Sequence, residues 1–154
     1  MNITIRKSTT SDFESIFSLV HELAVFQGTP ERIINSVQQM KEEQEYFQSF
    51  VAETDDKEIV GMASYFFTYY TWVGKSLFLD DLYVKPTYRG QKIGSKLLQR
   101  IMEVAEKENC KRVRWLVSKW NEEAITFYGK IGALIDEDVF VCDMEGEAIH
   151  SDIR

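Results

Sequence analysis

The stretch that decides the fold reads Asp80-Asp81-Leu82-Tyr83-Val84-Lys85-Pro86-Thr87-Tyr88-Arg89-Gly90-Gln91-Lys92-Ile93-Gly94. An apolar strand carries two carboxylates and ends at Pro86, which cannot continue a strand ladder. A helix then begins, because Ile93, Leu97, Ile101 and Val104 recur at helical spacing. The order of strand, glycine-containing turn and helix predicts an anion site, since the first amides of a helix and its dipole favour negative charge.

The turn at residues 89–94 does not identify an anion site by itself. Arg89 and Lys92 add positive charge, and the glycines let the backbone approach a ligand closely. The turn lacks the Gly-Lys-Ser/Thr ending of a P-loop, and it lies too late in the chain for a dinucleotide-binding fingerprint. An ordinary connection between a strand and a helix is the alternative interpretation.

Asp80 and Asp81 interrupt the apolar strand at residues 76–85. Neighbouring residues on a regular strand face opposite sides, so at least one carboxylate is expected on a covered face. A charge is costly there without a partner, and an enzyme would use it to hold an ammonium group or to accept its proton through water. The alternative is a strand end or bulge that leaves both acids in solvent.

A later helix is predicted over residues 121–131, with Asn121 as its N-cap and Gly132 as its stop. Tyr128 lies seven residues after Asn121, about two helical turns, so both side chains can face the same side. A phenol with an ordinary pKa of about 10 can donate a proton to a thiolate whose pKa is about 8.5. A packed core tyrosine is the alternative.

The remaining pattern predicts one α/β (α+β) domain over residues 1–154. Further strands are expected at residues 3–5, 47–53, 58–69, 112–118 and 139–144, and further helices after Ser11 and after Thr29-Pro30. The order βααβββαβαβ predicts a mixed central sheet of about six to seven strands, with helices on both faces.

Composition narrows the class of protein. The net charge of −7 argues against nucleic-acid binding and is compatible with a cationic small substrate, although many soluble proteins are acidic. No apolar run approaches the roughly 18 residues of a membrane span. Cys110 and Cys142 form no disulfide framework and match no metal spacing, so we expect no metal and a reducing cytoplasm.

Taken together, these motifs resemble the GNAT superfamily of acetyl-CoA-dependent N-acetyltransferases. Its cofactor motif, Gln/Arg-x-x-Gly-x-Gly/Ala, reads Arg89-Gly90-Gln91-Lys92-Ile93-Gly94 here, and a second motif reads Asn121-x-x-Ala124-x-x-Phe127-Tyr128. Residues 60–63, 65–69, 72–75 and 79–84 are similar to the diamine (spermidine/spermine) and thialysine N-acetyltransferase group. The resemblance runs from Ile3 to about Met144 and implies the GNAT fold.

The resemblance implies a role for each motif residue in transfer of an acetyl group to a diamine, polyamine or thialysine-like amine. The cofactor-binding set would be the backbone of Leu82, Tyr83 and Val84, the turn residues Arg89, Gly90, Gln91, Lys92, Ile93, Gly94 and Ser95, and Asn121, Ala124 and Lys130. Tyr128 would be the general acid, while Asp80 and Asp81 would bind the amine and assist its deprotonation. Phe26 and Gln27 would contact the substrate. A homodimer is common in this group.

Four departures from the group bear on the substrate. Lys92 replaces the first glycine of the motif, where its side chain can point away, and Asp80 replaces a longer glutamate. Gln27 lacks the charge of the usual acid, and Val139-Phe140 stands where a tryptophan is usual. These changes leave acetyl transfer in place and weaken the expectation of long polyamines. The alternatives are a GNAT enzyme for an aminoglycoside or protein amine, or a non-catalytic acyl-CoA-binding sensor.

Overall fold

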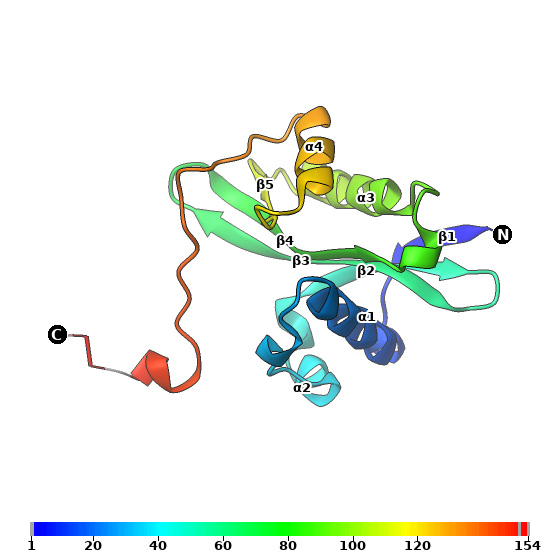
Figure 1. Ribbon diagram of the computed structural model, residues 1–154, viewed down its shortest axis with the longest axis horizontal. Helices are drawn as coiled ribbons and strands as arrows, with labels where there is room; N and C mark the ends of the chain where they lie inside the picture. The colour runs from blue at the N-terminus through cyan, green and yellow to red at the C-terminus, as the bar shows by residue number, and fades with distance from the viewer. Residues whose placement is uncertain (1, 151, 154) are drawn as a thin grey trace. The chain divides into compact units, whose positions relative to one another are not determined.

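The computed structural model describes residues 2–150, 152 and 153, and the chain forms two compact units, Met1–Leu116 and Val117–Arg154. The first unit contains β1 (Ile3–Lys7), α1 (Phe13–Phe26), α2 (Val37–Glu42), β2 (Gln48–Thr54), β3 (Ile59–Tyr70), β4 (Gly74–Val84), α3 (Ile93–Lys107) and β5 (Val113–Arg114) (Figure 1). The second unit contains α4 (Glu122–Lys130). Short 3-10 turns lie at Thr10–Asp12, Pro30–Arg32, Gln44–Tyr46, Pro86–Tyr88 and Gly146–His150.

The five strands of the first unit form one mixed sheet in the order β1-β2-β3-β4-β5. The first four strands are antiparallel neighbours, whereas β5 runs parallel to β4. The strands expected at residues 47–53 and 58–69 form the hairpin of β2 and β3, whose turn closes with a hydrogen bond from the Thr54 amide to the Glu58 carbonyl at 2.9 Å. The expected fold class is confirmed, with five strands in the described residues instead of six to seven.

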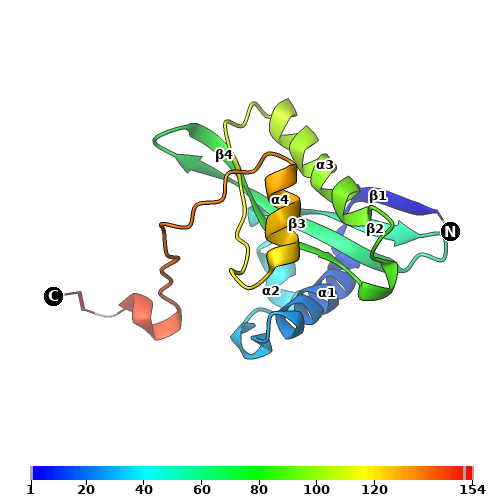
Figure 2. The ribbon, with the colours of Figure 1, turned by 45° about the horizontal axis from the view of Figure 1, so that its top comes forward.

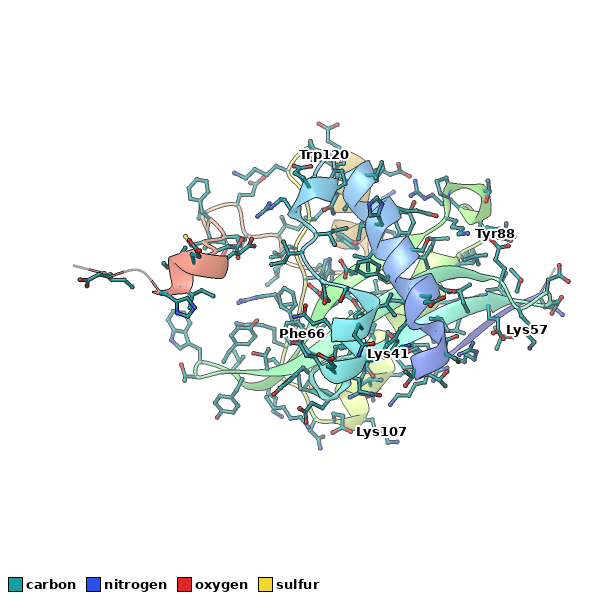
Figure 3. The ribbon with its side chains drawn as sticks, turned by 90° about the horizontal axis from the view of Figure 1, so that it is seen from below. Lys41, Lys57, Phe66, Tyr88, Lys107 and Trp120 are labelled. Carbon is teal, nitrogen blue, oxygen red and sulfur yellow. The ribbon has the colours of Figure 1, made fainter. Side chains whose placement is uncertain are left out.

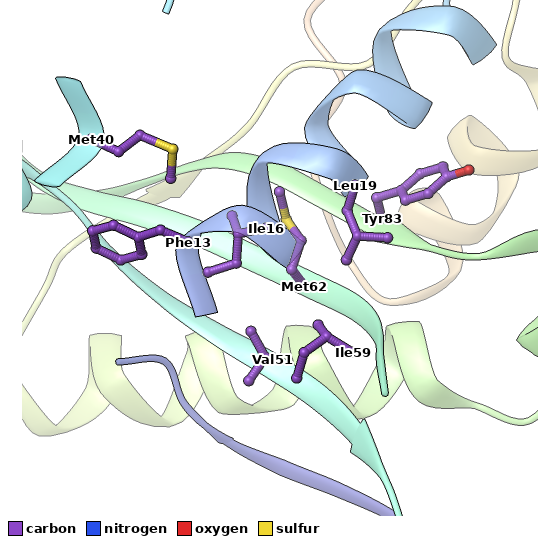
Figure 4. Close-up of a cluster of buried hydrophobic side chains, with 8 residues drawn as sticks. All are labelled: Phe13, Ile16, Leu19, Met40, Val51, Ile59, Met62 and Tyr83. Carbon is purple, nitrogen blue, oxygen red and sulfur yellow. The ribbon is translucent and has the colours of Figure 1, made fainter. Parts of the chain in front are cut away.

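Helices cover both faces of this sheet (Figures 1 and 2), and Figure 3 views it from the side of α1 and α2. On one face, α1 and α2 bury a cluster whose members also come from β2, β3 and β4 (Figure 4). The cluster consists of Phe13, Ile16, Leu19, Met40, Val51, Ile59, Met62 and Tyr83. On the other face, α3 buries Leu97, Leu98 and Ile101. Gly61 allows this close packing, because a Cβ atom there would meet the Tyr83 carbonyl oxygen at 3.2 Å and Leu97 Cδ1 at 3.4 Å.

An ion pair fixes the start of α1. Asp12 is 7% exposed and accepts two hydrogen bonds from the Arg6 guanidinium, at 2.8 and 3.0 Å, and one from the Thr9 amide at 2.7 Å. Arg6 also donates to Glu53 at 2.7 Å. The guanidinium hydrogen bonds hold the pKa of Asp12 below its ordinary value. Arg6 of β1 therefore ties the strand to the start of α1 through Asp12 and to β2 through Glu53.

Three predicted elements differ from the structure. The helix expected after Pro30 is a 3-10 turn, and α2 begins only at Val37, where the Ser36 hydroxyl accepts from the Gln39 amide at 3.1 Å. The strand expected at residues 112–118 shortens to β5. The strand expected at residues 139–144 is wrong. A strand requires a paired backbone, and no described segment pairs with this one. Its apolar side chains, including that of Phe140 at 86%, are also exposed.

Candidate active site

A β-bulge lies at the two acids of β4. In the ladder between β3 and β4, Ser64 pairs with Asp81 and the next residue, Tyr65, pairs with Leu79. Asp80 is therefore the extra residue, with no partner on β3. Bulges bend a strand and redirect its side chains, and they are common beside active sites.

The bulge breaks the alternation of side chains along β4. Leu79 lies opposite Tyr65, whose ring stacks on Phe50 with centroids 5.8 Å apart on the α3 face. Asp81 lies opposite Ser64, on the face that carries the α1 cluster, because directly paired residues share a face. Asp80 lies between these two neighbours, Leu79 and Asp81, which face opposite sides of the sheet. The side chains of Asp80 and Asp81 therefore do not point to opposite faces as neighbours on a regular strand would.

The two carboxylates influence each other's ionisation. Asp81 is half-buried and accepts a hydrogen bond from the Ser64 hydroxyl at 3.2 Å. Desolvation, followed by the charge of Asp80, raises the pKa of Asp81 to about 6, while the Ser64 hydrogen bond acts in the opposite direction. Asp80 reaches solvent, yet the protein around it desolvates the carboxylate and raises its pKa as well. The prediction of an acid on a covered face therefore fits Asp81. The alternative is right about the bulge and the exposure of Asp80, and it is wrong about Asp81.

No cation of the described first unit forms an ion pair with Asp81. A carboxylate with a pKa of about 6 is mostly ionised at pH 7 and can still accept a proton. The site can therefore bind an ammonium group and take part in its deprotonation.

The turn before α3 adopts an unusual backbone. Gly90 has φ of 80° and Lys92, the N-cap of α3, has φ of 61°. The left-handed conformation at residue 92 explains why glycine is usual there, because Gly adopts it without steric cost. The Lys92 side chain makes no capping hydrogen bond, so it leaves the first amides of α3 to other acceptors.

Glycine at position 94 is not required by packing within the chain. A Cβ atom there would meet only Val84 Cγ2, at 3.9 Å, which is ordinary van der Waals contact. A Cβ atom at Gly90 would meet nothing within 4 Å. Both glycines thus leave an open backbone at the start of α3, which suits the approach of a phosphate group.

Beside the acids, β4 forms an open sheet edge. It pairs with β5 only at Leu77 and Phe78, and it continues to Val84 without a strand partner on that side among the described residues. Leu82 and Val84, expected to bind a cofactor arm through their backbone, belong to this segment. The edge can therefore offer main-chain hydrogen bonds to an extended ligand.

The second unit contains the other predicted site residues. Asn121 caps α4, as expected, since its side-chain oxygen accepts from the Ala124 amide at 3.3 Å. Gly132 ends the helix with φ of 95°, also as expected, and the Ala133 amide donates to the Tyr128 carbonyl at 3.0 Å. Tyr128 is half-buried, and desolvation raises the pKa of its phenol. Lys130 is exposed in the last turn of α4.

The first unit contains the acids, the cofactor turn and the end of α1. Phe26 is the last residue of α1 and Gln27 follows as its C-cap. Asn121, Ala124, Tyr128 and Lys130 are grouped on α4 of the second unit. The first unit thus holds fourteen of the expected site residues and the second unit holds four.

Ser64 is a neighbour of the acids that the sequence analysis does not identify. It is a small polar residue inside the apolar run of β3, and only 8% of it is exposed. Counting residues across the hairpin from the pair of Tyr70 with Gly74 places Ser64 opposite Asp80, and the bulge moves its partner to Asp81. The serine within the apolar run, together with this count, was the available signal.

The whole sequence was compared with known proteins. Residues 12–133 match the family described as "Acetyltransferase (GNAT) family". Thialysine N-epsilon-acetyltransferase of Bos taurus is 33% identical over 161 residues, covering 96% of this chain and 95% of that protein. The spermidine/spermine N(1)-acetyltransferase-like protein 1 of Homo sapiens is 31% identical over 84% of this chain and 20% of its own length.

Solved structures agree on the fold. The crystal structure of a "predicted acetyltransferase with acetyl-CoA from Clostridium acetobutylicum" has a TM-score of 0.76 and 18% sequence identity, covering 92% of this chain and 96% of that one. The chain belongs to the acetyltransferase (GNAT) family and is an acetyl-CoA-dependent enzyme. Within that family it is related to amine acetyltransferases of the thialysine and spermidine/spermine type.

Other expectations concern partners and location. In the described part of the chain, no helix is both long and apolar enough to cross a membrane. Among the same residues, no group of three or more His, Cys, Asp or Glu could hold a metal ion. The absence of a metal, the homodimer, the cytoplasmic location and the single-domain organisation of residues 1–154 stay predictions.

Proposed function

We propose that the protein transfers the acetyl group of acetyl-CoA to a primary amine of a small cationic substrate, such as a diamine, a short polyamine or a thialysine-like amino acid. The observation that carries this proposal is the bulge that sets Asp80 and Asp81 together on β4 without a cation partner in the described first unit. Two adjacent carboxylates attract an ammonium group, and the names of the relatives point to substrates of this class.

Several residues of this chain suit acetyl-CoA, which supplies the acetyl group as a thioester. The first amides of α3, opened by Gly90 and Gly94, would hold the pyrophosphate. The open edge of β4 from Leu82 to Val84 would bind the amides of the pantetheine arm. The open glycine backbone and the uncapped helix start support this fit.

The protein's own groups would then manage two protons. Asp81 accepts a proton from the bound ammonium group through water, which leaves a neutral amine that can attack the thioester directly. Tyr128 donates its phenolic proton to the departing thiolate. The nitrogen of the tetrahedral intermediate gives its second proton to water, from which the tyrosinate is reprotonated, and the product amide forms without an acyl-enzyme. The raised pKa of Tyr128 keeps the phenol protonated at neutral pH, as a general acid requires.

A panel of amines tests the proposed substrate class. Coenzyme A release from acetyl-CoA would be measured with putrescine, spermidine, spermine, thialysine, lysine and an aminoglycoside. We expect the shorter amines to be preferred over spermine, because Gln27 lacks a charge for a distant ammonium group. A preference for the aminoglycoside, or no release with any of these amines, would contradict the proposal.

Substitution of Tyr128 tests the general acid. Tyr128→Phe should lower kcat by about 100-fold or more, because general acid catalysis contributes at least that much, while the acetyl-CoA Kd stays unchanged. Tyr46→Phe is the matched control, since Tyr46 is 69% exposed and belongs to no predicted site. Equal turnover by Tyr128→Phe and the wild type would remove Tyr128 as the acid.

A further inference from the structure

Arg89 is held by the protein on three sides. Its Nε donates to the Val84 carbonyl at 3.1 Å, at the end of β4. Its guanidinium carbon lies 5.6 Å from the ring centroid of Tyr83 and 5.4 Å from that of Phe26. Both distances are within the range of a cation–π interaction. The side chain that begins the cofactor turn is thus anchored to both β4 and α1.

The turn needs such an anchor because the backbone of Lys92 adopts an unfavourable conformation. Two of its residues, Gly90 and Lys92, have left-handed φ values of 80° and 61°. A lysine seldom adopts that conformation, so surrounding contacts must maintain it. Arg89 directly precedes this pair, and its side-chain contacts tie the turn to the sheet.

A second contact joins the same parts of the first unit. Burial, and after it the charge and hydrogen bond of Glu22, raise the pKa of Tyr83, while Arg89 lowers it. Glu22 and Phe26 are four residues apart on α1, so they lie on one side of the helix. The last turn of α1 therefore meets the end of β4 at Tyr83 and the cofactor turn at Arg89.

We propose that Phe26 is a positioning residue for the acetyl-CoA turn and not a contact for the amine. Phe26 and Tyr83 hold the Arg89 guanidinium, and Arg89 holds residues 89–92 in the conformation that exposes the first amides of α3. The inference rests on the proposed role of this turn in binding acetyl-CoA. A movement at the end of α1 would consequently change the affinity for acetyl-CoA.

Binding of coenzyme A in the absence of any amine tests this role. Phe26→Leu removes the aromatic face but retains apolar volume, and the coenzyme A Kd measured by calorimetry should rise about two- to fivefold. Phe26→Tyr restores a ring and should restore the Kd. Val25→Ala is the matched control, because Val25 is a neighbour on α1 that is 56% exposed. The amine KM at saturating acetyl-CoA should not change in Phe26→Leu.

A double substitution separates positioning from a general loss of structure. Phe26→Leu combined with Arg89→Gln should weaken coenzyme A binding no more than Arg89→Gln alone, because either change removes the cation–π contact. Additive effects would overturn the proposal, and so would an amine KM that rises in Phe26→Leu while the coenzyme A Kd stays constant. A wild-type protein that fails to bind coenzyme A would instead reject the proposed function of the turn.

Discussion

Asp12 and Asp81 are two carboxylates of the first unit with opposite surroundings. Asp12 accepts two hydrogen bonds from Arg6, and its pKa lies below the ordinary value. Asp81 has no cation partner in the described first unit and accepts one hydrogen bond from the neutral Ser64, and its pKa rises to about 6. Asp12 is buried and Asp81 is half-buried, so burial alone does not explain why the pKa of Asp81 is the one that rises.

The partner decides which role each carboxylate can have. The charge of Asp12 is satisfied inside the protein and therefore contributes to the stability of the fold. The charge of Asp81 is desolvated without compensation and therefore costs free energy until a cation arrives. An amine substrate would supply the charge that Arg6 supplies to Asp12. Perturbed carboxylates of the second kind are typical of functional sites.

The largest expected effect is a loss of activity when Asp81 is substituted. Asp81→Asn should lower kcat/KM for the amine by about 100-fold or more, because the variant loses the proposed base and one amine ligand. The free energy of unfolding at pH 7 should stay equal or increase, since an uncompensated charge disappears. Steady-state kinetics and urea unfolding of the same preparation measure both quantities.

Asp80→Asn is the paired variant for this experiment. Asp80 is more exposed and has no partner on β3, so its loss should affect the amine KM more than the rate of the chemical step. Acetyl-CoA affinity should be unchanged in both variants. If Asp81→Asn retains wild-type kcat/KM, Asp81 is neither the base nor an essential amine ligand.

The same substitution at Asp12 should have the opposite outcome. Asp12→Asn should lower the free energy of unfolding by about 2 kcal/mol, the usual range for hydrogen bonds to a charged group. Turnover per folded molecule should not change, because Asp12 lies at the start of α1 and not on β4. Urea unfolding measures the loss, and Asp56→Asn in the exposed hairpin turn is the control. A fully stable Asp12→Asn variant would remove the distinction between the two acids.

The sequence indicated the functional role of Asp81 more readily than the ion pair of Asp12. An acid inside an apolar strand is conspicuous, and the cofactor turn, the N-cap Asn121 and the stop at Gly132 follow from local residue chemistry. Asp12 resembles an ordinary helix-start residue, because its partner Arg6 lies on a separate element. The bulge at Asp80 depends on pairing between β3 and β4, which a local pattern does not encode.

The predicted strand at residues 139–144 failed for a related physical reason. Alternating apolar residues show that a segment can form a strand, but a strand also needs a partner for its backbone. Phe26 illustrates the same limit at the site, since its neighbour Arg89 lies far along the sequence. Local propensity was therefore predictable, whereas contacts between distant segments were not.

The pH dependence of stability should also differ between the two acids. A raised pKa means that folded Asp81 binds its proton more tightly than the unfolded chain does, so its contribution falls as pH rises from about 4 to about 6. The lowered pKa of Asp12 contributes stability above the ordinary carboxyl pKa, and this is lost as pH falls through the folded value. In urea unfolding from pH 3 to 7, the Asp81→Asn variant should lose less free energy of unfolding than the wild type as pH rises from about 4 to about 6. In Asp12→Asn, the loss of stability towards acid pH should be smaller, and identical profiles for the two variants would refute the assignment.

The smallest expected effect concerns the hydrogen bond that Asp81 does have. Ser64→Ala removes the one interaction that lowers the pKa of Asp81, so the acid limb of kcat/KM should move upward from about pH 6 while the plateau at high pH stays nearly the same. Ionisation of the amine itself is common to both enzymes and cancels in the comparison. Ser49→Ala is the matched control, because Ser49 pairs with Ser64 in the ladder, is also buried and bonds to Ser8 at 2.6 Å. An acid limb that moves equally in both variants would show that the shift comes from a general change of the sheet. A shift in Ser64→Ala alone would show that a neutral hydroxyl makes a small adjustment to the pKa of Asp81, whereas the charged Arg6 keeps Asp12 ionised.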